Sequence, residues 1–153
     1  MQKLIIIMDT DVQGQTIGNA LRQVSLATAT FMRKMMNDSW VEKFYNESLN
    51  NGQITDGVYF RKEFENWLGK SHNLDSNIEI RQADTSSNLA LSEFLENNKI
   101  MHFRYEDWEM PYSNFYGIEG KVITEACSVI FLDELNHRDD VISEIEQKSS
   151  PHI

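Results

Sequence analysis

Acidic side chains gather where two predicted strands end. Asp9 and Asp11 follow an apolar run near the start of the chain, and Glu106 and Asp107 end a later one. In open α/β sheets, ligands bind beyond the carboxyl ends of the strands. Carboxylates at this edge are candidate general bases, or oxygen ligands for a hard cation. The alternative, which we favour, is that these acids cap helices and face water.

A short polar turn leads from the first predicted strand into the first predicted helix. Gly14, Gln15 and Thr16 precede the helix, and a helix N-terminus binds anions through its backbone N–H groups. The turn has no lysine and no longer glycine pattern, so a plain turn is the simpler interpretation. We keep Gln15 as a candidate binding residue, together with Asp11 and Glu106.

Aromatic residues cluster in a segment without helical or strand periodicity. Trp108, Tyr112, Phe115 and Tyr116 lie between Asp107 and Glu119. Large aromatics in such a segment either cover the edge of a sheet or form a lid or a partner-binding patch. We name Trp108 and Tyr112 as candidate binding residues on the second interpretation.

The sequence does not indicate a metal site or a disulfide. Cys127 is the only cysteine and lies in a strongly apolar run, so we expect it in the core. The four histidines are scattered, without the spacing of a zinc site. His102, beside Arg104 on a predicted strand, is expected to be a hydrogen-bonded structural residue rather than a proton-transfer group. We therefore expect no metal and no cofactor.

The charge of the chain limits its partners. The formal net charge is -10, which argues against extended nucleic-acid binding because that binding depends on neutralising phosphates. The apolar run at residues 4–8 is too short for a signal peptide or a membrane span, so we expect a cytoplasmic protein that does not bind membranes. A protein partner or a small-molecule ligand remains open, and the sequence does not indicate an oligomeric state.

The apolar patterns alternate between strand and helix along the chain. This alternation predicts one α/β domain over residues 1–147, with a four-stranded mixed sheet, helices on both faces and a flexible tail at 148–153. Strands are expected near 3–8, 78–80, 100–105 and 127–132. Helices are expected over 17–35, from 40 to 49, over 60–68, from 88 to 97 and from 136 onward. The first helix is expected to turn one apolar stripe inward: Ile17, Leu21, Val24, Thr28, Phe31 and Met35.

The order of these elements resembles the type II peptidyl-tRNA hydrolases and the families that share their fold. The opening K-L-I-I-I-M-D-T-D-V of residues 3–12 is similar to the family's K-x-V-x-V-x-x-D-L. Residues 14–20, G-Q-T-I-G-N-A, are similar to its turn G-K-x-A-A-Q. The resemblance implies the same scaffold and a hydrolase that cleaves an ester or amide linkage. It would place Asp107, with Thr16 or Ser113, near the chemistry.

The catalytic motifs of that family are not retained. Thr16 stands where the family has a lysine. The later D-x-G-x-T would begin at Asp107, but residues 107–111 contain neither the glycine nor the threonine, and Ser113 has a different spacing. The function we predict is therefore a non-catalytic interaction or ligand-binding protein on this scaffold. The alternative is a hydrolase of peptidyl-tRNA or of another ester or amide.

Overall fold

The computed structural model describes residues 3–11, 17–45, 78–109, 122–132 and 138–151. They form an α/β structure, as the sequence predicts. The helix expected at 60–68 lies outside the described residues. In chain order the elements are β1 (Lys3–Asp9), α1 (Ile17–Met35), α2 (Asp38–Tyr45), β2 (Ile78–Ala83), α4 (Thr85–Asn97), β3 (His102–Glu109), β4 (Val122–Leu132), α5 (Asp139–Lys148) and β5 (Ser150–Pro151).

The strands form one mixed sheet in the order β3-β4-β1-β2-β5. The β1 and β2 strands are parallel, and the other neighbours are antiparallel. The sheet has five strands rather than the predicted four. The fifth lies at the start of the segment expected to be a flexible tail, where Ser150 pairs with Gln82 and Pro151 with Arg81. A proline fits such a short edge strand because it cannot donate to a central ladder.

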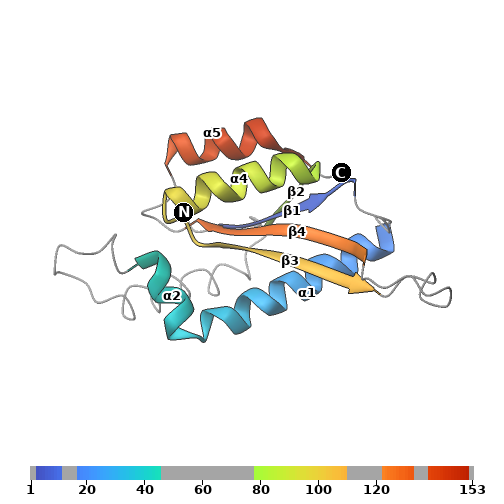
Figure 1. Ribbon diagram of the computed structural model, residues 1–153, viewed down its shortest axis with the longest axis horizontal. Helices are drawn as coiled ribbons and strands as arrows, with labels where there is room; N and C mark the ends of the chain where they lie inside the picture. The colour runs from blue at the N-terminus through green and yellow to red at the C-terminus, as the bar shows by residue number, and fades with distance from the viewer. Residues whose placement is uncertain (1–2, 12–16, 46–77, 110–121, 133–137, 152–153) are drawn as a thin grey trace.

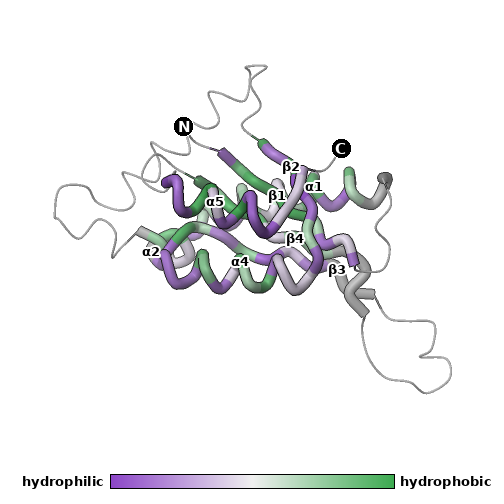
Figure 2. The backbone as a smooth tube through the Cα atoms, turned by 90° about the horizontal axis from the view of Figure 1, so that it is seen from above, coloured by the Kyte–Doolittle hydropathy of each residue, from purple (hydrophilic) through white to green (hydrophobic). Residues whose placement is uncertain are grey.

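Helices cover both faces of the sheet (Figure 1), with α1 and α2 on one face and α4 and α5 on the other. The β1 strand has no polar face because both of its faces are covered, and Leu4 to Met8 are all buried. Figure 2 shows the contrast between this hydrophobic strand and the alternating hydropathy along α4. The predicted alternation in β3 is confirmed, since Phe103 faces the α1 core and Ile100, just before the strand, lies in the α4 core. No helix of the described residues is long and apolar enough to span a membrane.

Helix α1 follows the predicted apolar stripe at Val24, Phe31 and Met35 but departs from it at Leu21. Phe31 packs on Phe131 of β4, with ring centroids 5.3 Å apart, and Ala20 and Ala27 are buried on the same side. Leu21 lies one residue beyond Ala20, a turn of about 100° around the helix, and is 67% exposed. The prediction that Leu21 faces the core was wrong. Small alanines let the helix lie close to the sheet, and their positions determine which side of α1 faces inward.

Candidate functional site

A buried carboxylate occupies the carboxyl end of β1. Asp9 is fully buried, although its position at a strand end predicts a residue facing water or a ligand. Its Oδ1 accepts hydrogen bonds from Asn88 Nδ2 at 2.6 Å and from Arg104 Nη1 at 3.1 Å. Its Oδ2 accepts from Arg104 Nη2 and lies 2.9 Å from the hydroxyl of Thr85, which has one proton and donates it either to Asp9 or to Asp11. Asp9 is thus the centre of a polar cluster that joins β1, β3 and α4.

Most acceptor positions of the Asp9 carboxylate are occupied. A carboxylate offers about four acceptor positions on its two oxygens, and three of them face N–H donors of Asn88 and Arg104. A general base needs an acceptor position for the substrate proton, and a hard cation needs one for its coordination bond. At Asp9 the one remaining position faces the Thr85 hydroxyl and the side chain is fully buried, so its main role in the described structure is to pair with Arg104.

Arg104 reaches Asp9 by crossing β4, the strand between them. The β4 residues that pair with Arg104 and Glu106 are Ser128 and Ala126, two small and buried side chains. Their size leaves room for the guanidinium above the sheet. Burial by itself would lower the pKa of Arg104, but the hydrogen bonds and charge of Asp9, with the charge of Glu106, raise it above its already high ordinary value.

Asp11, a predicted binding residue, holds the start of α4. Its Oδ1 accepts from the Thr85 N–H at 2.8 Å and lies 2.5 Å from the Thr85 hydroxyl. Hydrogen bonds from Thr85 lower the pKa of the exposed Asp11 carboxyl. Asp84, the N-cap residue, accepts from the Ser87 N–H at 2.6 Å. The favoured interpretation of Asp11 as a helix-capping acid therefore agrees with the geometry, because acceptors of this kind satisfy the unpaired N–H groups of a first helical turn.

Other predicted site residues have less defined surroundings. Glu106 lies beside the cluster, with its Oε1 3.3 Å from Arg104 Nε. Asp107 and Trp108 belong to β3, where the pairing with β4 shifts register between them, but their side chains lie outside the described set. The remaining predicted site residues lie outside the described residues altogether: Gln15, Thr16, Tyr112 and Ser113. The roles proposed for these residues stay predictions.

Two buried oxygens of the α4 face lack a hydrogen bond within the described structure. They are Oδ1 of Asn88 and Oγ of Ser128. Asn88 uses its amide nitrogen for Asp9 and for the Ile7 carbonyl, at 3.2 Å, which leaves its oxygen without a donor. A buried polar atom without a partner costs about 1–3 kcal/mol. The packing around the Asp9–Arg104 pair is therefore not fully optimised for stability.

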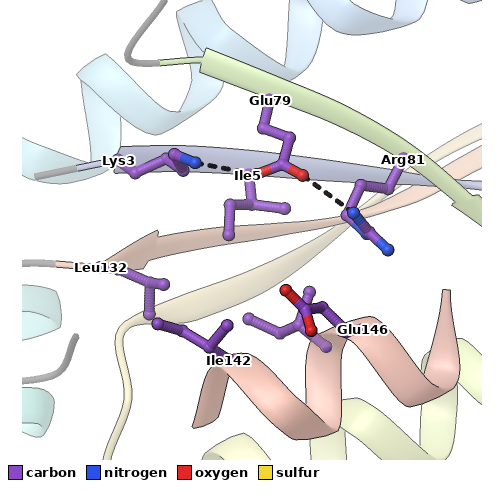
Figure 3. A pocket seen from close by; sticks show the side chains of 8 residues that line it. Lys3, Ile5, Glu79, Arg81, Leu132, Ile142 and Glu146 are labelled. Carbon is purple, nitrogen blue, oxygen red and sulfur yellow. Dashed lines mark hydrogen bonds and ion pairs between the residues drawn. The ribbon is translucent and has the colours of Figure 1, made fainter. Parts of the chain in front are cut away.

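A pocket of about 260 Å³ opens at the opposite end of the same face (Figure 3). It lies between the sheet and α5. Its aliphatic walls come from β1, β4 and α5, and its charged groups from β1, β2 and α5. The residues that line it are Lys3, Ile5, Glu79, Arg81, Leu132, Ile142, Ile145 and Glu146.

One wall of the pocket is a chain of three charged side chains. Glu79 accepts from Lys3 Nζ at 3.0 Å and from Arg81 Nη1 at 2.9 Å. Arg81 is buried and also donates from Nε to Ser149 Oγ at 2.6 Å and from Nη2 to the Ser149 carbonyl at 3.0 Å. Burial tends to raise the pKa of Glu79, but the hydrogen bonds and charges of Lys3 and Arg81 outweigh it and lower the pKa. These contacts hold the wall in one geometry and tie β2 to the end of α5.

Sequence reasoning missed this pocket and the partners of Asp9. A signal was present in both cases. Glu79 and Arg81 are charged residues two positions apart in β2, and Arg104 is a charged residue in β3. Charged residues are almost never buried unless they are paired, so a charge on a covered face of a sheet indicates a buried pair. What the sequence does not contain is the register that brings the partners together.

His102 behaves as expected, since its Nδ1 donates to the Ile100 carbonyl at 2.7 Å. Within the described ranges, no group of three or more His, Cys, Asp or Glu residues is arranged to hold a metal ion.

Comparison with protein-family models finds no family that matches this chain. Comparison with curated proteins finds none with significant similarity.

Proposed function

We propose that this protein is a non-catalytic ligand-binding protein, and that the pocket between the sheet and α5 binds a small amphiphilic molecule. The observation that carries the proposal is the pocket itself. It combines aliphatic walls with a charged wall that is held rigid by Glu79, Arg81 and Ser149. Small-molecule sites have this composition: mostly apolar surface with a few fixed polar groups that orient the ligand.

The buried polar cluster supports a role without catalysis. Asp9 is fully buried at the edge where catalysis would be expected, and N–H donors of Asn88 and Arg104 occupy both of its oxygens. Asp11 is occupied with the first turn of α4. A binding function needs neither of these groups, because the pocket lies at the other end of the face.

We also propose that the scaffold is of the type II peptidyl-tRNA hydrolase kind. Support comes from the resemblance of residues 3–12 and 14–20, and from the mixed sheet in which α1 and α2 lie between the parallel strands β1 and β2 along the chain. Cleavage of peptidyl-tRNA is expected to be absent, because Thr16 replaces the lysine of the motif and the chain carries ten net negative charges. A turnover assay decides this point: cleavage that is abolished by Asp107→Ala would establish the hydrolase alternative.

Methyl NMR with a library of small amphiphiles tests the binding function. Ligands should shift the methyl signals of Ile5, Ile142 and Ile145, which line the pocket. Ile142→Phe, which fills the pocket from a half-buried position, should abolish these shifts. Leu89→Phe, which adds the same ring at a position on α4 that is 51% exposed, should leave them unchanged. Shifts confined to other parts of the protein, or no saturable shifts at all, would refute the proposal.

A further inference from the structure

The charged groups of the pocket lie on two opposing sides. On the sheet side, Lys3 and Arg81 share one acid, Glu79, which leaves this wall with one net positive charge. On the helix side, Glu146 of α5 lines the pocket, and Figure 3 shows it across from Glu79 and Arg81. The Glu146 side chain makes no hydrogen bond or ion pair with another described residue. The pocket therefore presents a positive wall and a separate negative group.

The positive wall keeps hydrogen-bond capacity for an anion. An ammonium has three N–H donors and a guanidinium has five. Within the described structure, Lys3 uses one of its donors for Glu79, and Arg81 uses three, one for Glu79 and two for Ser149. Only 7% of the Arg81 surface is exposed, so the orientation of its guanidinium is fixed. A carboxylate beside this wall would receive charge-assisted hydrogen bonds, which are stronger than neutral ones.

The remaining surface of the pocket requires an aliphatic group of limited size. Ile5, Leu132, Ile142 and Ile145 supply branched aliphatic walls without any aromatic ring. The volume of about 260 Å³ lies below the range of roughly 300–1,000 Å³ that is typical of sites for drug-sized ligands. The occupant is thus smaller than a drug-sized molecule and has a compact aliphatic part.

We infer that the ligand of this pocket is an aliphatic zwitterion, a free amino acid of about the size of leucine. The inference rests on the proposed binding function and specifies its ligand class. The carboxylate would lie at Lys3 and Arg81, the ammonium at Glu146, and the side chain against the isoleucines. A simple aliphatic acid would leave Glu146 without a cation, and a simple amine would leave the donors of Lys3 and Arg81 without an anion. The four charged side chains sum to zero, which matches a ligand without net charge.

Binding measurements with three probes that share the same isobutyl group test the ligand class. Leucine carries both charges, 4-methylpentanoate lacks the ammonium, and isoamylamine lacks the carboxylate. Leucine should bind more tightly than either, by roughly threefold to tenfold, because each missing charge removes one partly exposed ionic contact. Methyl NMR on the intact chain gives the affinity and shows whether each probe occupies the pocket.

Substitutions of single charges assign the two contacts. Glu146→Gln should weaken the binding of leucine by a similar factor and should leave the binding of 4-methylpentanoate unchanged or make it tighter. Lys3→Gln should weaken the binding of leucine and of 4-methylpentanoate but leave the binding of isoamylamine unchanged. Glu93→Gln, at an exposed position of α4, is the matched control and should change nothing.

The outcomes separate this inference from the proposed function. If 4-methylpentanoate binds as tightly as leucine and Glu146→Gln has no effect, the zwitterion is wrong while the pocket remains a ligand site. If none of the three probes gives a saturable shift below roughly 10 mM, where binding is worth less than about 3 kcal/mol, the inference is also overturned. The amphiphile library then decides whether the pocket binds anything. If leucine shifts residues away from the pocket, both proposals fail.

Discussion

The guanidinium of Arg104 on β3 binds the carboxylate of Asp9 on β1 by passing over β4. Strands β3 and β1, which are not neighbours in the sheet, are thereby linked through side chains across β4. Asn88 and Thr85 add the first turns of α4 to the same group. The pair is nearly inaccessible, with side-chain exposures of 15% for Arg104 and 0% for Asp9, so each charge depends on the other for its solvation.

Removal of one partner of this pair should be strongly destabilising. Asp9→Ala or Arg104→Ala leaves a buried charge unpaired, which typically costs about 3–5 kcal/mol. Denaturant unfolding at neutral pH measures the loss for each variant. A loss below about 1 kcal/mol for either variant would mean that water reaches the remaining charge and that the pair is not buried in solution.

The double variant Asp9→Leu with Arg104→Met is the informative control. It removes both charges together and replaces them with apolar groups, so no unpaired ion remains. The double variant should be more stable than either single alanine variant. A double variant that is less stable than both single alanine variants would contradict a direct interaction between these residues.

Two serines on the α4 face should respond differently to the same substitution. Ser128 Oγ is buried without a partner in the described structure, so Ser128→Ala should be neutral or stabilising by up to about 1 kcal/mol. Ser149 Oγ accepts from Arg81 Nε, so Ser149→Ala should cost about 1–2 kcal/mol. Thermal and denaturant unfolding of both variants checks the contrast, and equal losses would show that Ser128 has a partner in solution.

The ion pairs of Glu79 should make stability depend on pH in the acid range. The folded pKa of Glu79 is lowered, and the ordinary value is 4.5. Its contribution is therefore complete above pH 4.5 and is lost as the pH falls below 4.5 through the folded pKa. Glu79→Gln removes this contribution, which is about 1 kcal/mol or less because Glu79 is one-third exposed.

The measurement for Glu79 is the difference in unfolding free energy between parent and variant at several pH values. Asp11, a second described acid with a lowered pKa, is present in both proteins, so its effect cancels. The difference should be constant near neutral pH and should shrink below pH 4.5. A difference that grows on acidification would have the wrong sign for a lowered pKa.

The sequence predicted the layers of this fold because they depend on local patterns. The apolar run of β1 and the alternation around Phe103 both depend on which residues are buried, and a period of two or 3.6 reveals that directly. Cys127 was correctly placed in the core for the same reason. The strand count was not predictable in this way, because β5 is only Ser150 and Pro151 and its pairing with Arg81 is a tertiary contact.

The candidate site was harder to predict than the fold. Asp9 and Asp11 are two residues apart and have the same side chain, yet one is buried in an ion pair and the other is exposed at a helix start. The difference is set by Arg104, which is 95 residues away from Asp9 along the chain. Local sequence indicates that an acid lies at a strand end, but only the strand register determines which partner reaches it.

The orientation of α1 gives a final prediction that uses one chemical change at two positions. Leu21 is 67% exposed, so Leu21→Ala removes little buried surface and also introduces the residue with the best helix propensity. Its effect on the free energy of unfolding should lie within about 0.5 kcal/mol, as for other surface substitutions. Leu91 on α4 is fully buried, and Leu91→Ala should cost about 2–5 kcal/mol because it creates a cavity.

Denaturant unfolding of the two variants under the same conditions measures the contrast. A loss for Leu21→Ala close to that of Leu91→Ala would mean that Leu21 faces the core after all, as the apolar spacing of the sequence predicted, and that α1 is rotated in solution relative to the orientation described above.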